Sequence, residues 1–387
     1  MKTKTAQLLP VLLPVFSGFF IMGFADVVGI TSTYVKEDFN LSDTSANILP
    51  LMVFLWFAVF SIPTGLIMNS IGRRKTVVIS MFVTLAAMLV PLIAYRFIVV
   101  LIAFALLGIG NTILQVSLNP LLSTIVCSNR LTSNLTLGQF IKAIASFLGP
   151  IIAGLAVTRF DNWKYIFPLF ALITIISTLW LWLTPIAEVP SKNESSSFTK
   201  SLGLLNDKTI LILFLGIILV VGIDVGLNTT IPRYIMERCN IPRETAGLGT
   251  SLYFAARIIG TFAGAVLLTK ISGRSFFITS MIIAVISMSV IIIFGNIWSI
   301  LTMIFITGLA IANVFSIIFS MALKRMPDST NEMSGLMIMG VAGGAFIPVL
   351  MGLVSDFTGT QAGGLLLLVF AAVYLLFSAV KVNAIPC

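Results

Sequence analysis

Long runs of apolar residues, separated by short polar stretches, recur along the whole chain of 387 residues. A helix needs about 20 predominantly apolar residues to cross the hydrocarbon core of a bilayer, and these runs reach that length. The pattern therefore predicts twelve membrane-spanning helices. They cover residues 8–35, 46–70, 76–95, 97–126, 136–157, 163–184, 209–232, 246–270, 275–294, 297–323, 333–354 and 361–381.

The widest polar interruption runs from Pro185 to Lys208 and includes the stretch Ser191-Lys-Asn-Glu-Ser-Ser-Ser. It follows the sixth predicted helix, so we interpret residues 185–208 as a cytoplasmic linker. The predicted fold class is an all-α polytopic membrane protein with two six-helix bundles, residues 1–184 and 209–387.

An internal repeat supports this division. A shift of 198 residues aligns the first, fourth and fifth predicted helices with the seventh, tenth and eleventh. Six helices are an even number, so the two halves have the same orientation in the membrane. Parallel halves with a substrate site near the midplane describe one large class of transporters. The aligned pairs are Asp26 and Asp224, Thr31 and Thr229, Gly110 and Gly308, Gln115 and Asn313, Pro150 and Pro348, and Gly154 and Gly352.

The composition agrees with a membrane protein. Charged residues make up 10% of the chain and the mean hydropathy is +1.10, whereas soluble domains carry about 25% charged residues. These values exclude an ordinary cytosolic enzyme, a disordered chain and a nucleic-acid-binding protein. The net charge of +9 is expected from Lys and Arg in cytoplasmic loops, where they outnumber those in the opposite loops if the N-terminus is inside. We therefore expect a plasma-membrane protein (a bacterial inner-membrane protein) with both termini in the cytoplasm.

Several kinds of chemistry are excluded by the residues themselves. Histidine is absent, which excludes histidine metal sites, catalytic triads and histidine proton relays. Cys127, Cys239 and Cys387 form no Cys-x-x-Cys motif, and a disulfide has no support. No Walker motif is present. We expect no catalytic residues, no metal and no organic cofactor.

Four ionisable residues lie deep in predicted helices: Asp26, Lys142, Asp224 and Arg257. Each costs about 2.5–3.5 kcal/mol at the centre of a membrane helix. One interpretation is that they form structural ion pairs, although buried pairs often stabilise no better than apolar replacements. The other, which we favour, is that they mark a pathway for a substrate or an ion.

The stretch between the second and third predicted helices reads Gly65-Leu-Ile-Met-Asn69-Ser-Ile-Gly72-Arg73-Arg74-Lys75. It resembles the G-x-L-a-D-r-x-G-R-r-k signature of the major facilitator superfamily. The resemblance implies that Gly65, Asn69, Gly72, Arg73 and Arg74 belong to a cytoplasmic gate. Asn69 stands where the superfamily has an aspartate, so the charge pairing of that gate is expected to differ here.

Within the superfamily, the chain is most similar to the fucose–galactose–glucose symporter group. The resemblance implies sugar transport coupled to a cation. The matching pieces are Pro63-Thr-Gly65, Asn119-Pro120, Leu135-Thr-Leu-Gly-Gln139 and Arg257-Ile-Ile-Gly260-Thr. The acids of the group are displaced: its acid in the fourth helix is Gln115 here, and its first-helix aspartate falls on Gly29. Proton coupling therefore does not carry over intact from the resemblance.

The superfamily arrangement implies which charges meet. It places the first, fourth, seventh and tenth helices around the cavity, with the fifth and eighth beside them. We therefore expect Asp26 to pair with Lys142, and Asp224 to pair with Arg257. A substrate that displaces the cation would then trigger protonation of the aspartate. Alternatively, Lys142 or Arg257 binds a substrate carboxylate, for which a sugar acid is the natural ligand.

Uncharged polar and aromatic residues on the same helices are candidate substrate contacts. Asparagine and glutamine offer both donors and acceptors for sugar hydroxyls, and aromatic rings stack on sugar faces. Hydrogen bonds between helices are the alternative explanation for the amides. The amide candidates are Gln115, Asn119, Gln139, Asn228 and Asn313, and the aromatic candidates are Trp56 and Tyr253.

Taken together, the residues and the resemblance predict a secondary active transporter. It would import a monosaccharide or sugar derivative, sugar acids included, by cation-coupled alternating access. The expected partners are the sugar, H⁺ or Na⁺, and the bilayer, with a monomeric chain and no nucleic acid. The alternative is a proton-coupled exporter of drugs or amphipathic compounds. It is favoured by Gly149-Pro150 with Gly154, which resembles the glycine–proline signature of drug antiporters, although close helix packing and a kink explain the same residues.

Overall fold

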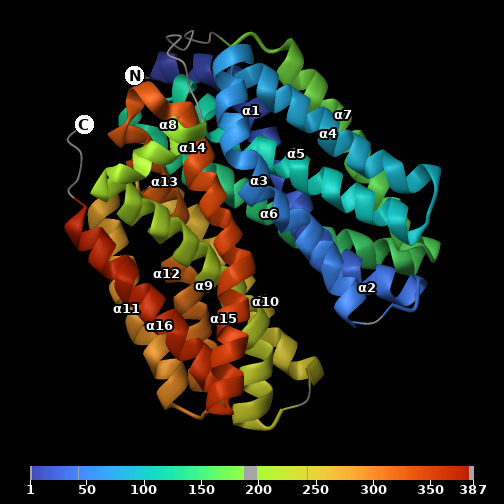
Figure 1. Cartoon of the computed structure of the whole chain (residues 1–387), viewed down its shortest axis with the longest axis vertical. Coiled ribbons are helices and arrows are strands. Elements are labelled where there is room, and N and C mark those ends of the chain that lie inside the picture. Colours follow the sequence, from blue (N-terminus) through green and yellow to red (C-terminus); the bar gives the residue numbers. More distant parts are fainter. Residues whose placement is uncertain (1, 42, 187–197, 242, 383–387) are drawn as a thin grey trace. The chain divides into compact units, whose positions relative to one another are not determined.

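The computed structural model describes residues 2–41, 43–186, 198–241 and 243–382, and all regular elements within these ranges are helices (Figure 1). Twelve stretches of the described chain are long and apolar enough to cross a membrane, which confirms the predicted all-α membrane fold. The helices of the first half are α1 (Lys2–Met22), η1 (Gly23–Val27), α2 (Val28–Asp38), α3 (Asp43–Ile71), α4 (Arg73–Ile93), α5 (Phe97–Ile125), η2 (Ser128–Arg130), α6 (Leu131–Phe160), η3 (Trp163–Tyr165) and α7 (Ile166–Leu183). Those of the second half are α8 (Phe198–Gly203), η4 (Leu204–Asn206), α9 (Lys208–Cys239), α10 (Arg243–Leu267), α11 (Gly273–Ile293), α12 (Ile297–Ile311), α13 (Val314–Arg325), η5 (Pro327–Ser329), α14 (Thr330–Met339), η6 (Gly340–Ala342), α15 (Gly343–Thr358) and α16 (Gln361–Lys381).

Three spans that the sequence predicts as continuous helices are interrupted. The first is broken by the 3₁₀ turn η1, the tenth between α12 and α13 at Ala312–Asn313, and the eleventh by η6. Short 3₁₀ stretches inside a helix often mark a functional hinge. The residues explain two of the breaks, because η6 and the start of α15 are rich in glycine and Asn313 uses its side chain to bond a neighbouring helix.

The contacts divide the chain into two compact units. Unit 1 comprises Met1–Cys127, Gly138–Gly203 and Asp328–Met339, and unit 2 comprises Ser128–Leu137, Leu204–Pro327 and Gly340–Cys387. Most of the predicted first bundle thus falls in unit 1 and most of the second in unit 2. The exceptions are η2 with the first turns of α6, which belong to unit 2, and the end of η5 with α14, which belong to unit 1. Much of the predicted linker lies outside the described residues.

The internal repeat is visible in one detail of each unit. In unit 1, Arg74 donates from its guanidinium to the carbonyls of Leu181 and Trp182 at the end of α7. In unit 2, Arg274 donates in the same way to the end of α16. The last carbonyls of a helix lack partners within it, and a cation there is stabilising. Arg74, predicted as part of a gate, therefore holds the third span to the sixth.

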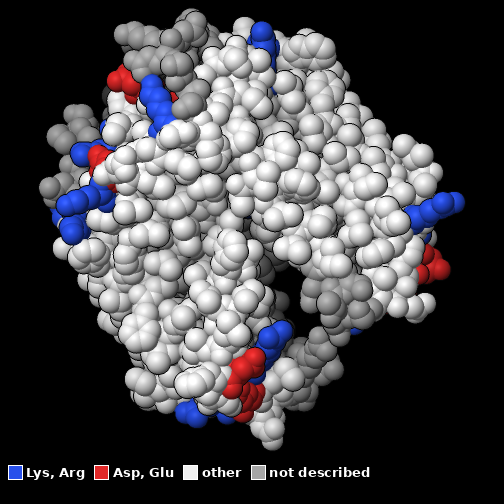
Figure 2. Space-filling model, in the orientation of Figure 1, with Lys and Arg blue, Asp and Glu red and all other residues white. Residues whose placement is uncertain are grey.

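Charged residues avoid the long flanks of the helices. On the face drawn in Figure 2, Lys, Arg, Asp and Glu gather at helix ends, and the surfaces between them are uncharged. Large apolar side chains are exposed along these flanks, among them Phe346, Leu353 and Phe357 on α15. An apolar helix flank exposed in this way fits contact with lipid.

Candidate functional site

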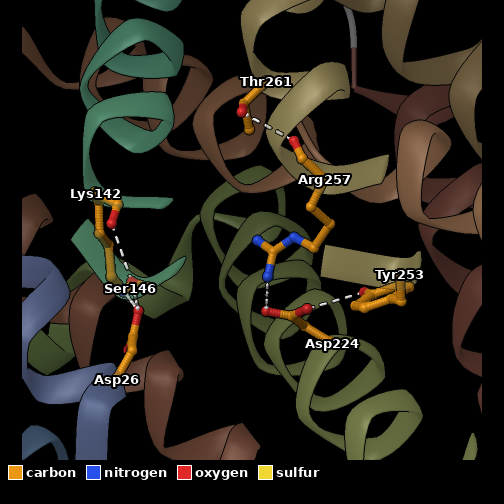
Figure 3. Close-up of polar contacts among 7 residues, drawn as sticks. All are labelled: Asp26, Lys142, Ser146, Asp224, Tyr253, Arg257 and Thr261. Carbon is orange, nitrogen blue, oxygen red and sulfur yellow. Dashed lines mark hydrogen bonds and ion pairs between the residues drawn. The ribbon is translucent and has the colours of Figure 1, made fainter. Parts of the chain in front are cut away.

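The first cluster of ionisable groups lies in unit 1. Nζ of Lys142, on α6, is 3.3 Å from Oδ2 of Asp26, which lies in η1 (Figure 3). Oγ of Ser146, one turn after Lys142, donates to the same Oδ2 at 2.7 Å. The side chain of Asp26 is 34% exposed and that of Lys142 is 20% exposed. The carboxylate is therefore neutralised and hydrogen-bonded, yet open on one side.

Close backbone contact places Asp26 in this position. A Cβ added to Gly23 would lie 2.6 Å from both the Lys142 carbonyl oxygen and the Ala145 Cβ, so only glycine lets η1 approach α6 so closely. Gly149, one residue before Pro150, makes room in the same way for the side chain of Val27. The glycine of the Gly149-Pro150 element thus has a packing role in this structure.

The second cluster lies in unit 2. Asp224 of α9 receives a hydrogen bond and ion pair from Nη1 of Arg257, on α10, at its Oδ2 atom (Figure 3). The hydroxyl of Tyr253, one turn earlier on α10, donates to Oδ1 at 2.9 Å. Tyr253 is fully buried, so in this structure its ring has no exposed face for a sugar. Both carboxylate oxygens of Asp224 are thus occupied by donors.

The two clusters break the internal repeat. Asp26 and Asp224 are related by the 198-residue shift, but their partners are not. Lys142 belongs to the fifth span of the first half, whereas Arg257 belongs to the second span of the second half. The repeat therefore fixes where the acids lie, and each unit supplies its own kind of cation.

Three of the predicted amides are buried, and two of them donate to backbone carbonyls. Nδ2 of Asn119 donates to the Gln115 carbonyl at 2.9 Å, and Nδ2 of Asn313 donates to the Gly260 carbonyl at 2.8 Å. Gln115, Asn119 and Asn313 are each at most 5% exposed. The Oδ1 atoms of Asn119 and Asn313 are buried and accept no hydrogen bond within the described part of the chain. Such buried acceptors are costly, which suits a site where a hydroxyl or water binds.

The other predicted contacts are half-buried. Oδ1 of Asn228 and Nε1 of Trp56 are buried and have no hydrogen-bond partner among the described residues. The Trp56 ring lies edge-on to Phe60, with centroids 5.6 Å apart. Gln139, on α6 three residues before Lys142, is half-buried. Within its own unit, each of these side chains retains hydrogen-bonding capacity for a ligand.

A polar network joins α3 to α14 within unit 1. Nδ2 of Asn69 donates to Glu332 at 2.5 Å, and Nδ2 of Asn331 donates to Asn69 Oδ1 at 2.6 Å. Nε of Arg73 donates to Asn331 Oδ1 at 2.7 Å. A Cβ at Gly65 would lie 2.7 Å from the Asn331 carbonyl oxygen, so glycine permits this contact. The superfamily motif has an acid where this chain has Asn69, and here Glu332 of α14 places an acid beside that position.

A second bond to α14 depends on a proline. Pro120 lies inside α5 and has no N–H, so the Val116 carbonyl loses its usual partner four residues on. Oγ of Ser334, on α14, donates to this carbonyl at 2.6 Å. Arg73 donates to the carbonyl of Pro120 itself at 3.3 Å. Gly72, at a φ of 88°, makes the turn that starts α4 and places Arg73 there.

Sequence reasoning missed several of these residues. Ser146 was detectable, because it lies four residues after Lys142 and so shares its helix face. Asn111 is buried, its Oδ1 accepts no hydrogen bond from the described residues, and it lies four residues before Gln115 in the same way. Asn331, Glu332 and Ser334 carried no signal, because nothing in the sequence joins the end of the second span to the start of the eleventh.

Two acidic residues outside the spans have well-defined partners. Burial raises the pKa of Asp207, but the backbone N–H groups of Thr209 and Ile210 and the Arg325 guanidinium outweigh it and lower this pKa below its ordinary value. Asp38 accepts from the Tyr95 hydroxyl at 2.5 Å and from the Trp163 indole at 3.0 Å. Burial, with the nearby Asp38 carboxylate, raises the pKa of Tyr95 far above its ordinary value.

Helices of spanning length with ion pairs inside them define a multi-pass membrane protein. The described residues hold no group of three or more His, Cys, Asp or Glu side chains that could bind a metal. The model of the Major Facilitator Superfamily matches residues 15–242 and 213–384. The chain therefore belongs to this superfamily, and it is a multi-pass membrane transporter.

Relatives and solved structures agree with this assignment. A putative glucose/galactose transporter of Helicobacter pylori is 26% identical over 391 residues, covering 94% of each chain. A probable sugar efflux transporter of Mannheimia succiniciproducens is 24% identical over 390 residues, covering 94% of this chain and 96% of that protein. The crystal structure of FucP in the outward conformation superposes with a TM-score of 0.84 at 17% identity, over 95% of this chain and 97% of FucP. At that identity the likeness to FucP concerns the fold.

Proposed function

We propose that this chain imports a monosaccharide or a close derivative by alternating access, coupled to the entry of a cation. The observation that carries the proposal is the Asp26–Lys142–Ser146 cluster, which keeps two charges inside a membrane helix bundle. Such residues are expensive and mark ion or substrate pathways. The name of the Helicobacter pylori relative supports a hexose as substrate.

The chemistry of the cluster suits H⁺ coupling. A carboxylate beside an ammonium stays ionised, and it becomes easier to protonate when a ligand draws the ammonium away. In the proposed cycle, a sugar hydroxyl or a sugar carboxylate binds Lys142 and releases Asp26 for protonation. Protonated Asp26 and bound sugar would then cross together. A sugar carboxylate would neutralise the Lys142 ammonium, whereas a sugar hydroxyl would leave it charged and hydrogen-bonded to the sugar.

The network between α3 and α14 is proposed to be the gate of this cycle. α14 belongs to unit 1 by its contacts, yet η6 connects it to α15, which belongs to unit 2. The predicted gate residues Gly65, Asn69, Gly72 and Arg73 lie at or beside this contact. We place this end on the cytoplasmic side, together with both termini, and expect a monomer in the bacterial inner membrane.

Uptake into proteoliposomes tests the proposal. Purified protein is reconstituted, and accumulation of labelled hexoses and sugar acids is measured under an imposed pH or Na⁺ gradient. We expect one sugar to accumulate under the pH gradient, and the Asp26→Asn variant to lose accumulation. The matched control is Asp207→Asn, which changes an acid at a helix start outside the spans. Absence of accumulation of every sugar under both gradients would contradict the proposal.

Export is the second candidate. The name of the Mannheimia succiniciproducens relative favours sugar efflux, and Gly149-Pro150 resembles the signature of drug antiporters. The packing of Gly149 against Val27 accounts for that glycine without an antiporter. Reversal of the pH gradient separates the two directions, because an antiporter accumulates substrate only when the proton gradient runs outward from the vesicle.

A further inference from the structure

The two membrane carboxylates differ in how many of their oxygens are occupied. Asp26 receives both of its contacts, from Lys142 and Ser146, on the single atom Oδ2. Asp224 receives Tyr253 on Oδ1 and Arg257 on Oδ2. Within the described chain, Oδ1 of Asp26 accepts no hydrogen bond, and that side chain is also the more exposed of the two, at 34% against 22%.

This difference decides where a proton can attach. A proton added to a carboxylate oxygen turns that oxygen into a donor, so it needs an acceptor or water in front of it. At Oδ2 of Asp224 the proton would face a guanidinium N–H, and an arginine has no acceptor and does not lose its own proton. At Oδ1 it would face the Tyr253 hydroxyl, which is buried with its ring and already donates there. Asp26 has an open oxygen and needs no such rearrangement.

The cations of the two clusters also make Asp26 the aspartate that is more easily freed from its partner. Lys142 carries a single flexible ammonium at 3.3 Å, which can swing away from the carboxylate. Arg257 bonds Asp224 directly, and the guanidinium stays charged at every accessible pH. Other ionisable groups do not alter this comparison. α5, which packs against η1, has none between Phe97 and Ile125, and within the described chain the side chains that bond Asp224 are Tyr253 and Arg257.

We infer that Tyr253 is a positioning residue that keeps Asp224 ionised against Arg257, so that proton exchange within the membrane is confined to Asp26. The second cluster is then a permanent ion pair, and the first is the exchangeable one. The inference rests on the proposed coupling to H⁺ at Asp26, and it adds that Asp224 takes no part in that coupling because Tyr253 and Arg257 occupy both of its oxygens. It also gives a reason for the broken repeat: equivalent aspartates with different partners perform different tasks.

Tyr253 is held in place by its surroundings. A Cβ at Gly308, on α12, would lie 2.9 Å from the Tyr253 carbonyl oxygen and 3.2 Å from its ring. The ring therefore packs against a glycine, and the hydroxyl is fixed 2.9 Å from Asp224. Tyr253→Phe removes this one hydrogen bond and keeps the packing. It leaves Oδ1 of Asp224 without its donor, which is the condition that already holds at Asp26.

Infrared difference spectroscopy of the reconstituted protein, recorded between neutral and acidic pH, reports carboxyl protonation without any need for transport. In the wild-type protein we expect a membrane carboxyl signal that Asp26→Asn removes and Asp224→Asn leaves unchanged. In Tyr253→Phe we expect a second signal of equal, one-carboxyl amplitude, which the double variant Tyr253→Phe/Asp224→Asn loses. Circular dichroism verifies that each variant is folded.

Tyr234→Phe is the matched control. Tyr234 is also buried in unit 2, but its hydroxyl donates to a backbone carbonyl, that of Ile291, at 2.7 Å. This variant should give the wild-type spectrum. A wild-type signal that Asp224→Asn removes would overturn the inference, as would a folded Tyr253→Phe with the wild-type spectrum. The comparison of Asp26→Asn with Asp224→Asn uses no Tyr253 variant, so it decides the assignment even where Tyr253→Phe does not fold.

The spectra test the assignment of the proton to Asp26, and the uptake assay tests the proposed function, so the two proposals can fail independently. Predicted spectra from a protein that accumulates no sugar would refute the proposed substrate and support the assignment of the proton to Asp26. Sugar accumulation driven by a pH gradient, together with an Asp224-dependent spectrum, would support the proposed function and overturn the assignment.

Discussion

Lys142 Nζ lies 3.3 Å from Asp26 Oδ2, and the backbones around the two residues touch because Gly23 has no side chain. The ion pair therefore depends on a helix break and on a glycine, and not on the charges alone. Its two side chains are partly exposed, so the pair is accessible to a ligand while it stays within the helix bundle of unit 1.

Lys142→Ala tests what the pair contributes. Asp26 would lose its cation and keep Ser146, and we expect a loss of about 1–3 kcal/mol of stability, less than for a fully buried pair because Asp26 is partly exposed. Asp26→Asn/Lys142→Ala should recover stability in a thermal unfolding assay but should not recover gradient-driven uptake. Normal uptake by Lys142→Ala would refute both proposed uses of the lysine, as coupling partner and as substrate ligand.

The proline in α5 gives a sharper test of the α14 contact. Ser334→Ala leaves the Val116 carbonyl buried without a donor, because Pro120 supplies none, and we expect a cost of about 1–3 kcal/mol. Pro120→Ala restores an N–H at the position that bonds this carbonyl in a regular helix. A double-mutant cycle measured by unfolding should therefore show coupling, with the Ser334→Ala cost reduced in the Pro120→Ala background. Additive effects of the two substitutions would show that the contribution of the Ser334–Val116 hydrogen bond does not depend on the proline at position 120.

Replacement of the Asn69 amide by a carboxylate tests the proposed gate. Asn69→Asp places a second carboxylate beside Glu332, and like charges at this distance oppose each other. We expect hydrogen exchange of the α14 amides to rise about tenfold, since 1.4 kcal/mol corresponds to a factor of ten. Asn69→Asp/Glu332→Gln restores one acid and one amide with their positions exchanged, and it should return exchange toward the wild-type rate. Unchanged exchange in Asn69→Asp would count against the network as a gate.

The loop before α9 provides a pH prediction outside the membrane. The folded-state pKa of Asp207 lies below its ordinary value, so its contribution to stability is present above that ordinary value and is lost as the pH falls through the folded pKa. Because both partners are partly exposed, the contribution should stay below about 1 kcal/mol. Asp207→Asn keeps a residue that caps the helix and should remove this acid-range loss. Unfolding curves of the two proteins at several acidic pH values measure the difference, and parallel curves would contradict the assignment.

The sequence predicted the features that the membrane constrains most strongly, which are the spanning helices and the ionisable residues inside them. Twelve apolar runs of spanning length admit few alternatives to twelve helices, and ionisable residues are so costly in such runs that Asp26, Lys142, Asp224 and Arg257 stood out. The breaks at η1, at Asn313 and at η6 were not predicted, because apolar content continues through them. Hydropathy measures transfer into lipid and carries no information on local backbone geometry.

Tertiary contacts account for the rest of what the sequence did not indicate. Tyr253 was predicted to stack on a sugar, and its aromatic ring gave no sign that the hydroxyl would be committed to Asp224. The charge pairing of the gate was expected to differ at Asn69, and nothing in the sequence indicated that α14 would place the acid Glu332 against it. The internal repeat gave no help in either case, because the 198-residue shift places Leu55 at the position of Tyr253 and Asn134 at that of Glu332.

Gradient-driven uptake tests the central claim most directly. Wild-type protein and Asp26→Asn are reconstituted in parallel, and labelled hexoses and sugar acids are offered under an inward proton gradient. The account predicts that one sugar accumulates in wild-type vesicles above its outside concentration, and that Asp26→Asn equilibrates the same sugar without accumulating it. Accumulation by Asp26→Asn equal to that of the wild-type protein would contradict it.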